Sequence, residues 1–430
     1  MPRSDDERAR DTAEAVARRS YGKLVAFLAA RTRDVAGAED SLSDAFAAAL
    51  ADWPKQGIPE KPEAWLVAVA RRKMIDAERR RRVGVSAAGH LRLIFDELSE
   101  LEAAATSDTH IPDRRLALMF ACAHPAIDPG IRAPMILQTI LGFNAAEIAS
   151  AFLISPATMS QRLVRAKSKI KQAGIPFRVP DRPDLRQRLD AVLAAIYAAF
   201  AEGWSDPAGT ETRRRNLAEE GLWLARLLVS LLPDEPEALG LLSLMLHAEA
   251  RRAARRSAGG DFVPLAEQDP GHWDARMIDE AEALLSRASR MNAVGRYQLE
   301  AAVQSAHVVR RRTGRSDWTA IERIYDALLT LTGSPVVAIN RAVVIAETGG
   351  AAAGLAALDA VASDTRLGDY QPFWAARADL LARTNNFDAA DAAYQRATGL
   401  EADPAVRRFL EERRAELAAR SGKNLAKGGN

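Results

Sequence analysis

Residues 144–171 read NAAEIASAFLISPATMSQRLVRAKSKIK, which is the pattern of two short helices joined by a tight turn. The first helix is expected over 145–152, with an asparagine before it as cap. Ser155 and Pro156 form the turn, because serine is a favoured N-cap and proline a favoured first residue of a helix. The second helix is then expected over 157–171. The inward-facing residues would be Ile148, Ala149, Phe152, Met159, Leu163 and Ile170.

The outer face of this second helix is polar and basic. Gln and Arg side chains can read base edges, while Ser, Thr, Lys and Arg can anchor phosphates. One interpretation is a helix-turn-helix whose second helix enters the major groove of DNA. The alternative is an amphipathic hairpin with a solvated basic face. The candidate DNA-contacting residues are Ser155, Thr158, Gln161, Arg162, Arg165, Lys167 and Lys169.

The helical period extends over almost the whole chain of 430 residues, in which strand-forming stretches are scarce. This predicts an all-α protein of two or three domains. Near the N-terminus, helices are expected over 21–32 and 38–53, the second ending at Pro54, and a third over 62–82.

The helix expected over 62–82 carries a second basic face. Cations beside partly exposed apolar groups suit single-stranded DNA, which offers phosphates and unstacked bases. A solvated, charged helix end is the alternative interpretation. The candidate residues are Trp65, Arg71, Arg72, Asp76, Arg79 and Arg80.

Charge is unevenly distributed along the chain, although its formal total is only +2. Residues 1–180 hold 27 Lys and Arg against 22 Asp and Glu, whereas residues 181–430 hold 32 against 35. A polyanionic partner is therefore expected for the first part alone.

A single cysteine, Cys122, excludes an intramolecular disulfide. The charged N-terminus has no signal-peptide core, and no apolar run is long enough to span a bilayer, so a cytoplasmic protein without membrane contact is expected. Cys122 and His124 could ligate a metal, but no second pair has ligand spacing, which favours a packed helix end. Other histidines are scattered, so neither an enzyme nor a cofactor is indicated.

The sequence suggests three helical domains, a linker and a repeat. We expect helical domains over 11–82 and 113–178, a linker over 83–112 with one short helix at Leu91–Leu101, and a helical extension over 185–420. In the extension, small and aromatic residues recur at the spacing of tetratricopeptide repeats, most clearly within 334–404, and a weaker copy is shifted by 36 residues. The residues of the clearer copy are Trp374, Ala378, Ala390, Tyr394 and Ala397.

Several motifs resemble one family. Ala38-Glu39-Asp40 with Ala45-Phe46, and Pro62-x-Ala64-Trp65-Leu66 with Ala70-Arg71-Arg72-x-x-x-Asp76, resemble region 2 of the extracytoplasmic-function (ECF) sigma factors of the sigma-70 family. The pattern at 144–171 resembles their region 4. Phe120-Ala121-Cys122-Ala123-His124-Pro125 and Ser334-Pro335-Val336-Val337-x-x-Asn340-Arg341-Ala342 resemble a subgroup with a tetratricopeptide-like extension.

The resemblance implies an alternative sigma factor that directs RNA polymerase core to promoters and initiates transcription. Region 2 would bind the clamp helices of the largest polymerase subunit through Asp40, Asp44 and Phe46, and would open the −10 element. Region 4 would contact the polymerase flap and read the −35 element. The extension would regulate through contact with the sigma domains. Two alternatives remain open: a helix-turn-helix regulator with a repeat sensor domain, and a repeat scaffold.

Overall fold

Helices make up nearly all the regular secondary structure of the described residues. A computed structural model describes residues 4–81, 114–152, 154–175, 180, 182–204, 212–314 and 316–427. Within these ranges there is no strand beyond an isolated antiparallel bridge between Arg256 and Phe262. The predicted all-α class is confirmed. The linker and the short helix expected at Leu91–Leu101 lie outside the described residues.

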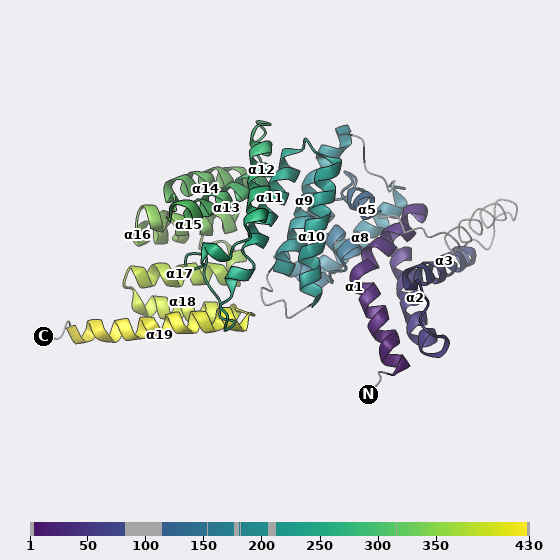
Figure 1. Cartoon of the computed structure of the whole chain (residues 1–430), viewed down its shortest axis with the longest axis horizontal. Helices are drawn as coiled ribbons and strands as arrows, with labels where there is room; N and C mark the ends of the chain where they lie inside the picture. The colour runs from purple at the N-terminus through teal and green to yellow at the C-terminus, as the bar shows by residue number, and fades with distance from the viewer. Residues whose placement is uncertain are drawn as a thin grey trace. The chain divides into compact units, whose positions relative to one another are not determined.

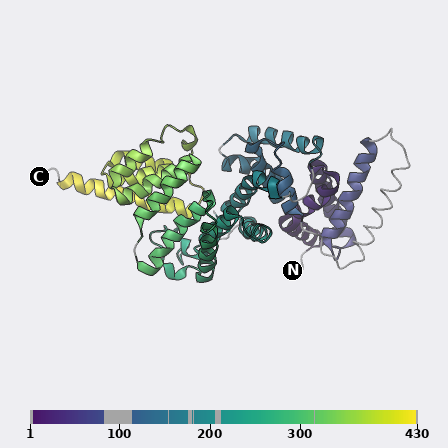
Figure 2. The same ribbon diagram turned by 90° about the horizontal axis from the view of Figure 1, so that it is seen from above.

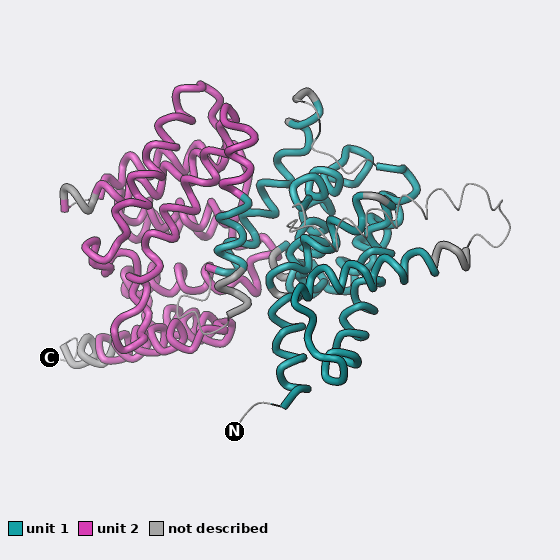
Figure 3. The backbone as a smooth tube through the Cα atoms, turned by 45° about the vertical axis from the view of Figure 1, so that its right-hand side comes forward, with its two compact units in different colours: residues 1–203, 212–224 teal, residues 204–211, 225–430 magenta. Residues whose placement is uncertain are grey.

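The chain divides into two compact units (Figure 3). Unit 1 comprises residues 1–203 and 212–224, and unit 2 comprises residues 204–211 and 225–430. Unit 1 thus contains both predicted N-terminal domains and the first residues of the predicted extension. The domain boundaries expected from composition stay predictions.

Unit 1 is built from helices between α1 and α10, most of which are labelled in Figure 1. They are α1 (Asp5–Thr32), α2 (Val35–Gln56), α3 (Pro62–Arg81), α5 (Arg115–Cys122), α6 (Pro129–Leu141), α7 (Ala145–Ala151), α8 (Pro156–Gln172), α9 (Arg182–Trp204) and the part of α10 (Thr212–Leu231) up to Leu224.

Helix α1 begins at Asp5, well before the expected start at residue 21. Ser4 and Glu7 form a capping box, in which the Glu7 N–H donates to Ser4 Oγ (3.2 Å) and the Ser4 N–H donates to Glu7 Oε2 (3.0 Å). The local signal was therefore present in the sequence. The prediction that the next helix stops at Pro54 was wrong, because α2 continues to Gln56. A proline in the last turn of a helix removes only one hydrogen bond, and this helix ends at Gly57, whose φ is 88°.

Two groups of buried apolar residues hold unit 1 together. Helices α1, α2 and α3 each contribute a fully buried leucine, namely Leu24, Leu42 and Leu66. In the block formed by α5 to α8, the buried residues include Phe120, Met135, Ile148 and Leu163. Each such side chain adds roughly 1.5–3 kcal/mol when buried, so the two groups are the main source of local stability.

Helix α9 and the start of α10 belong to the same unit through specific contacts with α5. The Arg188 guanidinium donates to the Phe120 carbonyl at 3.4 Å. Arg115 forms an ion pair with Glu220, and its guanidinium lies 4.6 Å from the centre of the Trp223 ring. The first hairpin of the predicted extension therefore packs on the α5–α8 block.

Unit 2 is a succession of helices, each packed mainly on its neighbours in sequence (Figure 1 and Figure 2). They are α11 (Pro236–Ala250), α12 (Ala275–Ser289), α13 (Arg296–Thr313), α14 (Trp318–Thr332), α15 (Pro335–Thr348), α16 (Ala351–Asp359), α17 (Gln371–Arg383), α18 (Phe387–Leu400) and α19 (Pro404–Lys427), with short 3-10 turns η1 (Ala253–Arg255), η2 (Pro270–His272) and η3 (Thr365–Leu367).

The small residues that produced the 36-residue repeat lie at closely packed positions in unit 2. Ala342 on α15 and Ala378 on α17 are fully buried. A Cβ added at Gly354 on α16 would lie 2.6 Å from that of Ala346, so this helix pair approaches too closely for a larger residue. Tyr394 is buried and Trp374 half-buried, the latter donating through Nε1 to the Gly368 carbonyl at 2.9 Å.

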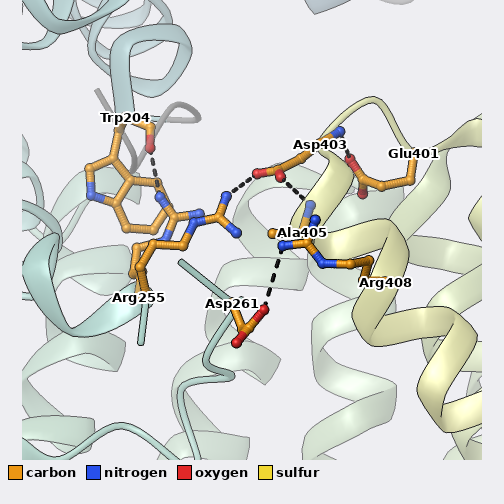
Figure 4. A network of polar contacts seen from close by, with 8 residues as sticks. Trp204, Arg255, Asp261, Glu401, Asp403, Ala405 and Arg408 are labelled. Carbon is orange, nitrogen blue, oxygen red and sulfur yellow. Dashed lines mark hydrogen bonds and ion pairs between the residues drawn. The ribbon is translucent and has the colours of Figure 1, made fainter. Parts of the chain in front are cut away.

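Long-range polar contacts join α19 to the segment after α11 (Figure 4). Arg256 forms an ion pair with Asp403, and Arg408 lies 3.5 Å from Asp261. Beside them, the Arg255 guanidinium stacks 3.7 Å from the centre of the Trp204 ring and donates to the Trp204 carbonyl at 2.6 Å. Residues about 150 positions apart in sequence are thus brought together inside unit 2.

Candidate nucleic-acid interface

The candidate residues of α3 fall on two sides of that helix. Trp65 is half-buried and packs edge-on against Trp53, with ring centres 5.5 Å apart. The Arg71 guanidinium lies 4.9 Å from the centre of the Phe27 ring on α1. Both side chains therefore contribute to packing as well as presenting a polar or aromatic edge.

Arg72 and Asp76 lie on the more open side of α3, where both are exposed. Arg79 and Arg80 belong to the last turns of the helix, but their side chains lie outside the described residues. Of the arginines predicted to form the basic cluster on this helix, the structure therefore places Arg72 on open surface and Arg71 against Phe27.

The face of α2 expected to contact polymerase is acidic with an apolar residue beside it. Asp40 and Asp44 are exposed, and Phe46 is half-buried. The Asp44 carboxylate lies 3.8 Å from Lys73 Nζ on α3, an exposed ion pair that contributes little to stability. A partner could therefore engage the two acids without breaking a strong contact.

Helices α7 and α8 have the caps that the sequence predicted. Asn144 Oδ1 accepts from the N–H groups of Ala146 and Glu147, each at 2.9 Å. Ser155 caps α8 by accepting from the Thr158 N–H at 3.3 Å, and the Ser155 and Thr158 hydroxyls lie 2.8 Å apart. Because these hydroxyls satisfy each other, their first role is to fix the start of α8.

The second helix presents most of its candidate residues to solvent. Gln161, Arg162, Arg165 and Lys169 are exposed, while Met159, Leu163, Ala166 and Ile170 pack inward. Arg162 and Arg165 are one turn apart and share the open face. The arrangement leaves a basic, hydrogen-bonding surface that a groove of DNA could accept.

Lys167 differs from the other candidates of α8. Its Nζ lies 2.5 Å from Glu39 Oε2 on α2, and the two side chains are only 13% and 15% exposed. Burial raises the pKa of Glu39, an effect that Lys167 opposes. One turn later, Lys171 forms an ion pair with Asp34. Sequence spacing carried no signal for these pairs, because their members are separated by well over a hundred residues.

Cys122 and His124 lie at the end of α5 in a packed environment. Burial raises the pKa of the Cys122 thiol to about 12, so it stays protonated and is a poor metal ligand. His124 Nδ1 accepts from the Ala126 N–H at 3.1 Å, and burial lowers the pKa of this histidine. In the described part of the chain, no group of three His, Cys, Asp or Glu residues could hold a metal ion.

None of the helices in the described ranges is long and apolar enough to cross a membrane.

Part of the chain matches a known protein family, and most of it matches one further protein. Residues 16–83, covering most of α1 and all of α2 and α3, match sigma-70 region 2. This N-terminal domain supports membership of the sigma-70 family, and region 2 indicates a role in transcription initiation with polymerase core and promoter DNA as partners. The chain also shares a family with uncharacterized protein R00370 of Rhizobium meliloti (strain 1021), which is 37% identical over 384 residues, or 89% of this chain and 90% of that protein.

Residues 188–289 match a family of unknown function designated DUF6596, which spans the end of unit 1 and the start of unit 2. No solved structure matches the chain.

Proposed function

We propose that the chain is an alternative sigma factor of the ECF subgroup, with a tetratricopeptide-like extension that regulates its activity. It directs polymerase core, in the cytoplasm, to specific promoters and performs no covalent chemistry itself. The observation that carries the proposal is the combination of a sigma-70 region 2 with an exposed basic helix, α8, in the same compact unit.

In this proposal, α1 to α3 form region 2 and the α5–α8 block forms region 4. The face with Asp40, Asp44 and Phe46 binds the clamp helices, and α3 holds the melted −10 strand through Trp65, Arg71 and their neighbours. Helix α7 and helix α8 form the helix-turn-helix that reads the −35 element in the major groove, while the block contacts the flap. The exposure of Gln161, Arg162 and Arg165 supports this role for α8.

A classical repressor or activator would share helices α7 and α8, but it would have no use for a sigma-70 region 2. A pure repeat scaffold would need neither. The region 2 match therefore favours the sigma factor.

Run-off transcription with purified core polymerase tests the proposal. The full chain is compared with a chain ending at Leu231, which keeps all of α10, and with one ending at Arg178, which removes α9 and its contacts with α5. Promoter-dependent transcripts are expected from the full chain, and an altered amount from the chain ending at Leu231. The chain ending at Arg178 is expected to lose stability as well, because Arg115 loses Glu220. No promoter-dependent transcript from the full chain would contradict the sigma-factor role, and identical transcription by the full chain and the chain ending at Leu231 would contradict regulation by the extension.

A further inference from the structure

An irregular strap, residues 256–268, lies between η1 and η2 and reaches α19 within unit 2. Its base is held by the mostly buried ion pair of Arg256 with Asp403. Its tip is a tight turn: the Ser257 N–H donates to the Asp261 carbonyl at 2.9 Å, and the Asp261 N–H donates to Ser257 Oγ at 3.0 Å. The turn therefore fixes the backbone that presents the tip to α19.

The strap meets one face of α19 through three pairs of side chains. The first is an ion pair at 3.5 Å (Figure 4), the second joins two aromatic rings edge-on with centres 5.4 Å apart, and the third is an ion pair at 2.7 Å. The strap supplies two acids and a ring, and α19 supplies two arginines and a ring. The pairs are Asp261–Arg408, Phe262–Phe409 and Glu267–Arg413.

The two ion pairs at the tip are largely open to solvent. The side chains of Asp261 and Arg408 are 68% and 54% exposed, and those of Glu267 and Arg413 are 55% and 38% exposed. Exposed ion pairs are weakened by water and salt and contribute little to stability. The tip can therefore leave α19 at low cost, while the base of the strap stays in place.

Helix α19 is packed on the rest of unit 2 independently of the strap. Leu410 and Leu417 are buried in a cluster with residues of α17 and α18. Arg414 forms an ion pair with Asp391 on α18. Loss of the tip contacts therefore leaves α19 in position.

The face of α19 that receives the strap also keeps its own shape. The Arg413 guanidinium lies 5.0 Å from the centre of the Phe409 ring, and a second acid, Glu416, lies 3.3 Å from the same guanidinium. Arg413 thus has contacts within α19 that hold it beside the ring when Glu267 leaves. The face is preformed for a new acidic and aromatic segment.

We propose that the face of α19 formed by Arg408, Phe409 and Arg413 is a docking site for a segment of another protein in which an aromatic residue follows an acid. The tip of the strap is the internal occupant of this site, and a partner segment displaces it. A tethered segment competes at an effective concentration in the millimolar range, so the strap excludes partners of low affinity. The inference concerns unit 2 alone and does not require the sigma-factor function.

A labelled peptide with the sequence of residues 257–268 tests the site in the full chain, with fluorescence anisotropy as the measure of binding. One variant empties the site by changing the three contacting residues of the strap. Its control removes two acids from exposed positions elsewhere in unit 2. The emptying variant is Asp261→Asn with Phe262→Ser and Glu267→Gln, and the control is Asp234→Asn with Asp279→Asn.

The peptide should bind the emptied variant about sixfold more tightly than it binds the parent, if its Kd is about 0.2 mM and the strap competes at about 1 mM. The control should behave as the parent does. In the emptied variant, the further change of Arg408→Gln with Arg413→Gln should abolish binding. Arg276→Gln with Arg323→Gln, which removes two exposed arginines from α12 and α14, should leave binding intact.

Equal affinity for the parent and the emptied variant, or binding that survives the loss of both arginines of α19, would overturn the docking site. So would the absence of binding to an emptied variant whose circular dichroism matches that of the parent. If that variant loses helix, Asp261→Asn alone takes its place and should bind about twofold more tightly than the parent, and no gain would count equally against the site. A dimer of the parent that exchanges straps between two copies, and that the emptied variant does not form, would overturn the assignment to another protein.

Discussion

Arg256 and Asp403 form an ion pair that joins the segment after α11 to the start of α19 in unit 2. The Arg256 side chain is 11% exposed and that of Asp403 is 25% exposed. Burial acts to raise the pKa of Asp403, but the Ala405 N–H and the Arg256 guanidinium outweigh it and hold this pKa below its usual range. The pair therefore depends on an ionised carboxylate in a largely dry setting.

Replacing Asp403 by asparagine should destabilise unit 2 by about 2 kcal/mol, because it leaves a mostly buried guanidinium without its counter-charge. The substituted amide could still accept from the Ala405 N–H, so the cap of α19 is kept. Urea unfolding of the full chain measures the change. The double variant Arg256→Met with Asp403→Asn should recover much of the loss, and a double variant as unstable as the sum of the two single ones would argue against direct coupling.

Arg162→Ala and Arg165→Ala should each weaken binding to a −35 duplex. Loss of the arginine that reads a base should reduce the binding free energy by about 1–3 kcal/mol and relax specificity at one position. Both side chains are exposed on α8, so folding should be unaffected. Binding to a set of single-base promoter variants measures the effect, with Arg10→Ala on α1 as a charge-matched control. Unchanged discrimination in both α8 variants would show that this helix is not the reader.

Arg72→Ala should slow promoter melting more than it weakens binding to duplex DNA, because the proposed ligand of α3 is the separated strand. Permanganate reactivity of the −10 region reports melting, and a filter-binding or fluorescence assay reports duplex binding. Lys55→Ala at the end of α2 removes the same charge from another exposed site. Arg71→Ala should show a further loss of stability, since Arg71 also packs on Phe27. Equal losses of melting and duplex binding for Arg72→Ala would contradict the assignment.

Unit 2 should lose stability in mild acid through His247. Burial, and secondarily the nearby Arg251, lowers the pKa of His247 to about 4, although Glu282 lies 3.4 Å from its Nε2. A histidine whose pKa is lower in the folded state releases a proton on folding. Its contribution to the free energy of unfolding is therefore complete above about pH 6.5 and is lost as the pH falls toward 4.

Between about pH 7 and pH 5, the lowered pKa of His247 should reduce the free energy of unfolding by about 2 kcal/mol, as measured by urea unfolding. His247→Leu should flatten this dependence, while substitution of the exposed His272 should leave it intact. The same slope in His247→Leu as in the parent protein would assign the effect to other groups.

Much of the local structure follows from the sequence by itself. The Ser155-Pro156 turn and the apolar spacing of Met159, Leu163 and Ile170 define α8, because caps and helical periods act over only a few residues. The burial of Ala342 and Ala378 was likewise expected, since small residues at repeat spacing mark close helix pairs. The start of α1 could have been found from the same kind of signal.

Only the tertiary structure decided which polar groups meet. The sequence placed Lys167 with the DNA-reading residues of α8, whereas packing of α8 on α2 brings it to Glu39, 128 positions away. Arg256 and Asp403 are likewise 147 positions apart. The energy of an ion pair depends on distance and on exclusion of water, and neither is encoded in local spacing; both arise when separate helices pack together. The sequence thus determined the helices and their faces, and the packing determined which faces remain open.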